Sequence, residues 1–284
     1  MFHNANRLTL ISLGLLSAGS ASGQSQGLPT SQPALLTIVR EEVKVGRAAD
    51  HAKHEAGWPA AFEKAKSPDY YLALVSMTGP NEAWYITPSA SHTAMAEGMK
   101  RDDADPVLSA ELNRLSRVDG DFLNGLRVIQ AAARPDLSMG DYPDIARMRF
   151  WEITIFRVRP GHEAAFDAAA KAYRAATQRA APSTRWRMYQ VIAGMPNPTY
   201  IAFGSVVGYN EFDKGMSDGE ATMRAFTAEE GALLEKFSKE SLLNAETNRF
   251  RLDPVQSYVS KEVRATDPAF WMPKRATARA AGSQ

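Results

Sequence analysis

The segment HAKHEAGW, residues 51–58, carries two histidines, a glutamate and a tryptophan within eight positions. His51 and His54 are three residues apart and Glu55 follows directly, so on a helix these side chains would be neighbours. An imidazole with a pKa near its usual value can exchange a proton with an acidic substrate, and a carboxylate can assist it. Three interpretations are open: an acid–base site, a metal site, or an ordinary polar face of a helix.

The metal interpretation has little support in the spacing of these residues. A zincin motif, HExxH, places its histidines four apart with the glutamate between them, and the chain lacks it. The chain has five histidines and no cysteine, which excludes thiolate ligands and thiolate catalysis. We therefore expect no dedicated metal site.

No other cofactor motif is present. The sequence contains neither a phosphate-binding loop nor a dinucleotide fingerprint. With 44% apolar residues and a net charge of +1, the composition is that of an ordinary globular protein. A nearly neutral chain of this kind is not expected to bind nucleic acid.

Residues 1–23 have the features of a secretory signal peptide. Arg7 precedes a short apolar run over 8–16, and small residues lead to Ala21-Ser22-Gly23. The run is too short to span a bilayer, which needs about 20 residues. We expect cleavage near Gln24 and a mature protein that is exported, to the periplasm or beyond, with no membrane span after cleavage.

The remainder of the chain contains an internal repeat with an offset of 115 residues. Val43 and Gly46 of VKVG align with Val158 and Gly161 of VRPG, and Gly79 aligns with Gly194. Tyr85-Ile86 likewise align with Tyr200-Ile201. We expect unit 1 over 30–135, a linker over 136–146, unit 2 over 147–260 and a flexible tail over 261–284.

Each half shows the same predicted order of elements, β-α-β-β-α-β, the ferredoxin-like unit. The expected strands of the first half are at 35–44, 70–78, 84–87 and 126–133, and its helices at 47–66, 90–100 and 107–124. Those of the second half are strands at 150–159, 185–193, 199–205 and 247–258, and helices at 162–179, 209–218 and 226–243. One face of such a sheet is bare, and two units can cover each other.

The strand order, the VxxG turn before the first helix and the strand pair around GPNEAWYIT resemble the dimeric α+β barrel superfamily. This superfamily includes antibiotic-biosynthesis-monooxygenase-like, NIPSNAP-like and chlorite-dismutase-like proteins. The resemblance implies two ferredoxin-like units forming one intramolecular barrel, with a pocket between a sheet and its helices. Haem-binding members carry a proximal histidine in the second unit, where this chain has only His162 beside a turn, so we expect no haem.

The repeat also predicts which way HAKHEAGW faces. With the 115-residue offset, His51, His54, Glu55 and Trp58 align with Phe166, Ala169, Ala170 and Tyr173, which form one apolar stripe of a helix. His51, His54 and Glu55 should therefore point inward, beside Trp58 and Phe62. Gly57 and Pro59 flank Trp58, and either can bend a helix. A bend there would change the inward orientation expected for residues 51–58.

Three functions remain open at this point. The first is an exported barrel protein with a small-molecule pocket between sheet and helices, to which His51, Trp58 and Phe62 would contribute. The second is a cofactor-independent, monooxygenase-like enzyme in which His54 and Glu55 form the acid–base pair. The third is a non-catalytic binding or structural module, and further association of chains is compatible with each.

Overall fold

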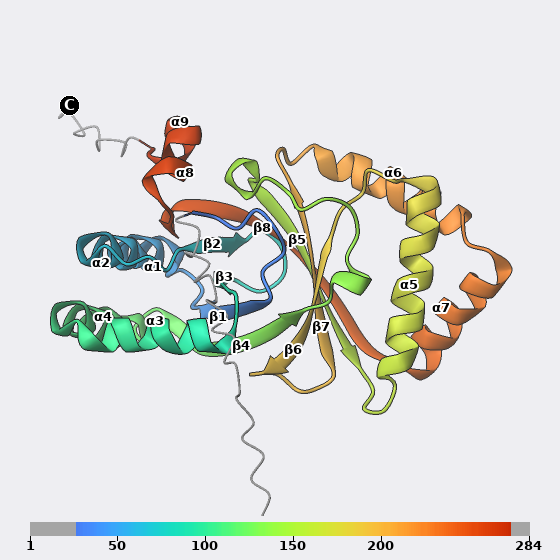
Figure 1. Cartoon of the computed structure of the whole chain (residues 1–284), viewed down its shortest axis with the longest axis horizontal. Helices are drawn as coiled ribbons and strands as arrows, with labels where there is room; N and C mark the ends of the chain where they lie inside the picture. The colour runs from blue at the N-terminus through green and yellow to red at the C-terminus, as the bar shows by residue number, and fades with distance from the viewer. Residues whose placement is uncertain (1–26, 274–284) are drawn as a thin grey trace, which may run out of the picture.

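The computed structural model describes residues 27–273, in which eight antiparallel strands form a closed barrel (Figure 1). Helices α1–α4 lie on one side of the barrel and α5–α7 on the opposite side. The fold is thus a mixed α+β fold with an eight-stranded antiparallel barrel. Both the signal peptide predicted over 1–23 and the last eleven residues lie outside the described part of the chain.

The first half contributes four strands and four helices. In chain order they are β1 (Leu35–Val43), α1 (Ala48–Glu55), α2 (Gly57–Ala65), β2 (Tyr71–Ser76), β3 (Glu82–Ser89), α3 (His92–Ala104), α4 (Pro106–Asp119) and β4 (Leu123–Ala133).

The second half follows with β5 (Phe150–Val158), α5 (Glu163–Ala180), β6 (Arg187–Ala193), β7 (Thr199–Val206), α6 (Glu211–Arg224), α7 (Ala228–Glu240) and β8 (Leu242–Tyr258). None of the helices in the described part of the chain is long and apolar enough to cross a membrane.

The strands are ordered β1-β3-β2-β8-β5-β7-β6-β4 around the barrel. The order β4-β1-β3-β2 in the first half is therefore repeated as β8-β5-β7-β6 in the second. The barrel closes where β2 pairs with β8 and β4 with β6. Alternate residues of β1 divide between two environments: Leu36 and Ile38 lie in the main core cluster of the barrel, while Val39 and Val43 belong to a cluster that includes Phe62 of α2.

The strand pairing corrects one part of the sequence alignment. Ile38 of β1 pairs with Ile86, whereas Ile153, 115 residues later, pairs with Phe203, 117 residues after Ile86. The second hairpin is thus two residues longer, and Tyr85 does not correspond to Tyr200 in the sheet. A count of identities cannot detect such an insertion when similar residues stand on both sides of it.

The helix expected over 47–66 is divided into α1 and α2 at Ala56. Pro59 has no backbone N–H to donate to the carbonyl of Glu55, which interrupts the helical ladder there. Gly57 allows close packing, because a Cβ at this position would lie 2.7 Å from Leu115 Cδ2 of α4.

The first part of the predicted flexible tail is ordered, which corrects that expectation for residues 261–271. They form α8 (Lys261–Thr266) and α9 (Pro268–Trp271), and the Trp271 side chain is buried in the main core cluster. The Trp271 Nε1–H donates to the carbonyl of Ala146. The predicted linker over 136–146 also packs against the barrel, since Leu137, Met139 and Ile145 are buried.

Candidate functional site

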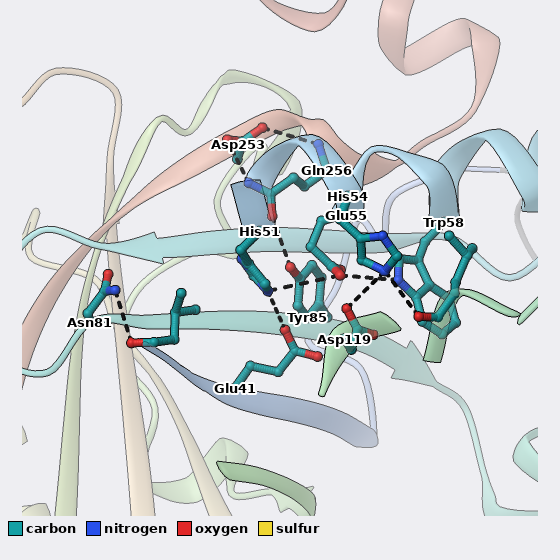
Figure 2. A network of polar contacts seen from close by, with 12 residues as sticks. Glu41, His51, His54, Glu55, Trp58, Asn81, Tyr85, Asp119, Asp253 and Gln256 are labelled. Carbon is teal, nitrogen blue, oxygen red and sulfur yellow. Dashed lines mark hydrogen bonds and ion pairs between the residues drawn. The ribbon is translucent and has the colours of Figure 1, made fainter. Parts of the chain in front are cut away.

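A cluster of ionisable side chains lies between the outer face of the first-half sheet and its helices (Figure 2). Five side chains form this cluster, which we call the carboxylate–histidine cluster: Glu41 of β1, His51, His54 and Glu55 of α1, and Asp119 at the end of α4. His51 and Glu55 are each only 3% exposed. The prediction that HAKHEAGW points inward therefore agrees with the structure in spite of the break after Glu55.

Glu41, His51 and Glu55 form the first part of the cluster. The His51 Nε2 atom lies 2.8 Å from Glu41 Oε2, at hydrogen-bonding distance, and 3.9 Å from Glu55 Oε1. The Trp58 Nε1–H donates to Glu55 Oε1 at 3.2 Å, so α2 helps to orient this carboxyl group.

His54, Glu55 and Asp119 form the second part. The His54 Nε2 atom lies 3.1 Å from the carbonyl oxygen of Leu115 and 3.1 Å from Asp119 Oδ1. Only the first contact has hydrogen-bond geometry, and Asp119 Oδ1 is buried without a hydrogen-bond partner. A buried carboxylate oxygen in that state is unusual in a folded protein.

The environment of the cluster disfavours negative charge. Burial, together with the nearby carboxyl groups of Asp119 and Glu41, raises the pKa of Glu55 to about 10. Burial also raises the pKa of Glu41, although the contact with His51 opposes that effect. Within residues 27–273, Glu41 and Glu55 form ion pairs with His51, and Asp119 forms one with His54. No lysine or arginine pairs with these three carboxyl groups there.

A cavity of about 60 Å³ adjoins the cluster at the N-terminal end of α1. His51 lines it together with Asn81, Glu82, Arg251 and Gln256. It has room for a few small atoms or about two water molecules, whose share of liquid volume is about 30 Å³ each. His51 is therefore the member of the cluster that faces free space.

The corresponding space of the second half is filled by apolar and aromatic side chains. His51 N–H bonds to the carbonyl of Arg47, and Phe166 N–H bonds to that of His162, so the two helices start in the same register. Phe166 stacks on Tyr200 at 3.8 Å between ring centroids and packs against Phe156 at 5.7 Å. The fold can thus close this space without a histidine or a carboxyl group at the positions of His51 and Glu41.

The remaining predicted site residues have different environments. Trp58 contacts Glu55, but neither Trp58 nor Phe62 is among the residues that line the 60 Å³ cavity. Phe62 instead stacks on Tyr258, with ring centroids 5.7 Å apart. His162 occupies the N-cap position of α5 without a side-chain capping bond, and its Nδ1 atom lies 2.9 Å from Ser241 Oγ.

Sequence reasoning missed Glu41 and Asp119. Glu41 had a detectable signal, because it alternates along β1 with Val39 and Val43, which makes it the one charged residue on that face of the strand. The sequence contains no such signal for Asp119, because its position beside His54 follows only from the packing of α4 against α1 and α2.

A second cavity, of about 80 Å³, lies against the barrel core. Its lining is mainly apolar, with residues such as Leu36, Leu74 and Phe203. It includes no member of the carboxylate–histidine cluster, so it is separate from the predicted site.

Comparison with solved structures finds proteins with a similar fold. A candidate monooxygenase from Fusobacterium nucleatum matches with a TM-score of 0.51 and 10% identity, over 79% of this chain and 94% of that one. An anthrone oxidase-like protein matches with a TM-score of 0.51 and 12% identity, over 80% and 94%. A chlorite dismutase from Candidatus Nitrospira defluvii has a TM-score of 0.45 and 9% identity, over 83% and 96%.

The two structures with a TM-score of 0.51 support the assignment of a mixed α+β barrel fold. At such low identity the likeness extends to the fold and not to an activity. No family model matches the sequence, and no curated protein matches it either.

Proposed function

We propose that this chain is an enzyme that acts on a small organic molecule between the first-half sheet and α1, at the carboxylate–histidine cluster. The observation that carries the proposal is the collection of five ionisable side chains in one buried place beside a cavity. Burying ionisable groups is unfavourable unless they are compensated, and strongly perturbed carboxyl groups gather at functional sites.

The second half supplies an internal comparison in favour of this proposal. There the positions of Glu41 and His51 are occupied by Phe156 and Phe166, which pack in an apolar cluster. Because the fold does not require charge at these positions, this comparison favours a functional role for the cluster over a purely structural one.

Proton transfer is the chemistry for which the cluster itself is sufficient. His51 lines the cavity and is held by Glu41, so it is better placed to meet a substrate than the pair His54 and Glu55 suggested by the sequence. The cavity would accept the reactive end of a larger molecule. The likeness to a candidate monooxygenase and an anthrone oxidase-like protein supports oxidation of an acidic organic substrate, with dioxygen as the oxidant.

The proposal includes two ferredoxin-like units in tandem. The repeated strand order supports it, as do Gly46 and Gly161, whose φ angles are 81° and 84°. A register shift at Val43 recurs at Val158.

We also propose that the protein is exported after cleavage near Gln24, for which N-terminal sequencing of the mature protein is the direct measurement.

The test uses the purified mature chain and a panel of phenols and enolisable aromatic ketones. Substrate consumption is followed by mass spectrometry and oxygen uptake by an electrode, for the unaltered protein and for His51→Asn. His162→Asn is the matched control, because it removes a histidine at the start of the other half's helix. Turnover that is lost in His51→Asn and kept in His162→Asn supports the proposal, whereas saturable binding without turnover would show a binding module.

A further inference from the structure

We infer that the carboxylate–histidine cluster binds divalent first-row transition-metal ions, with Glu55 as the ligand common to two adjacent positions. This inference rests on the proposed function for the location of the site and adds the identity of its cofactor. It departs from the expectation of no metal site, which followed from the spacing within residues 51–58 alone.

The donor atoms are already gathered around two positions. One atom each from Glu41, His51 and Glu55 lie within 4.8 Å of one another, and the same holds for His54, Glu55 and Asp119. Metal–ligand bonds of about 2.0–2.2 Å place two ligands of one ion roughly 3–4 Å apart. The observed separations of 2.8 Å, 3.1 Å and 3.9 Å between donor pairs need little side-chain movement to reach that geometry.

The charge balance of the cluster also favours a cation. Three buried carboxyl groups stand together, and within the described chain their ion-pair partners are two histidines. Arg47 lies near, but its guanidinium packs over Phe122 at 5.0 Å and pairs with Asp50. A divalent ion would displace the proton of Glu55 and bind at the point where the three carboxyl groups converge.

Asp119 gives an independent indication of a ligand. Its side chain is 8% exposed, and its Oδ1 atom faces His54 Nε2 at 3.1 Å without forming a hydrogen bond. The Oδ1 atom therefore has room for an ion, and His54 would join it as a ligand by exchanging its hydrogen bond to the Leu115 carbonyl for a bond to that ion. Trp58 Nε1–H, which donates to Glu55, provides the outer-shell hydrogen bond that orients a ligating carboxylate.

The donor types restrict the identity of the ion. Imidazole nitrogen mixed with carboxylate oxygen suits manganese, iron, cobalt, nickel, copper or zinc, whereas calcium and magnesium prefer oxygen ligands throughout. In the metal-bound protein His51 would serve as a ligand in place of its role in proton transfer, and the ion would act as a Lewis acid toward an oxygen atom of the substrate in the adjoining cavity.

The experiment measures metal binding directly and does not require a substrate. The full mature chain is treated with a chelator, dialysed and titrated with Co²⁺, whose visible absorption reports its ligands; bound metal per chain is then determined by elemental analysis. We expect one or two ions per chain. Glu55→Gln, which keeps the size of the side chain, should weaken binding by more than the roughly 10- to 100-fold typical for loss of an outer-shell partner.

Asp119→Asn is a second isosteric variant in case Glu55→Gln does not fold, and circular dichroism verifies folding of each. His162→Asn, outside the cluster, should bind Co²⁺ as the unaltered protein does. The inference is overturned if the unaltered chain binds no stoichiometric Co²⁺, or if both cluster variants bind it equally well. Metal binding without turnover would reject only the proposed enzyme. Turnover that persists after chelation would reject the metal as the cofactor of that enzyme.

Discussion

At the scale of single residues, the pair of Glu41 and His51 illustrates why a buried ion pair need not stabilise a fold. Both side chains lost their hydration on burial, and the contact between them must offset that loss. The second half contains phenylalanine at both equivalent positions, Phe156 and Phe166. Variants at Glu41 and His51 can therefore separate the contribution of charge to the free energy of unfolding from that of packing.

We expect His51→Ala to lower the free energy of unfolding of the metal-free protein by about 3–5 kcal/mol, because it leaves Glu41 buried without a partner. The double variant Glu41→Phe/His51→Phe should lose far less stability or gain up to about 4 kcal/mol, since apolar packing replaces the pair. Urea denaturation in chelator measures both. A double variant no more stable than His51→Ala would contradict this account.

At the scale of elements, two packing contacts fix parts of the chain to the barrel, and neither contact is evident from the sequence. The turn between β6 and β7 passes β4 so closely that a Cβ on Gly194 would lie 2.0 Å from the carbonyl oxygen of Val128. At the C-terminal end of the described chain, α9 is anchored through Trp271, which is 3% exposed.

Gly194→Ala should lower the free energy of unfolding by about 2–6 kcal/mol, through backbone strain at φ 88° and the clash with β4. Gly161→Ala is the matched control: its φ is 84°, but no atom lies within 4 Å of the added Cβ. It should lose only about 1–2 kcal/mol from the strained backbone. Equal losses in the two variants, measured by denaturant unfolding, would show that the contact with β4 is unimportant.

Trp271→Ala should lower the free energy of unfolding by about 3–5 kcal/mol, because it empties a large buried volume next to the barrel core. Met272→Ala, at a position 53% exposed, should change it by no more than about 0.5 kcal/mol. Thermal denaturation distinguishes the two. If neither variant changes the melting temperature, α9 contributes nothing to the barrel.

At the scale of the whole molecule, the two halves of the chain share one closed barrel and one main core. The main core cluster combines residues of both halves, such as Ile38 and Trp84 with Ile153 and Phe250. β8 is 17 residues long and pairs with β5 over its first part and with β2 over its last, so one strand connects the two halves.

We therefore expect equilibrium unfolding in guanidinium chloride to show a single transition, with coincident curves from far-ultraviolet circular dichroism and tryptophan fluorescence. Hydrogen exchange should report similar protection for β1 and β5 under native conditions. A transition in which one half retains its protected amides after the other has lost them would indicate separate domains.

The sequence by itself determined the order and approximate bounds of the strands and helices, because hydrophobic periodicity and turn residues are local properties. It also determined that His51, His54 and Glu55 face inward, since the second half preserved the apolar stripe at Phe166. Only the tertiary structure could join Asp119 to this group, because its distance from His54 depends on how α4 packs against α1 and α2. The same holds for α9: the burial of Trp271 depends on a surface formed by the barrel, which no pattern within residues 261–271 encodes.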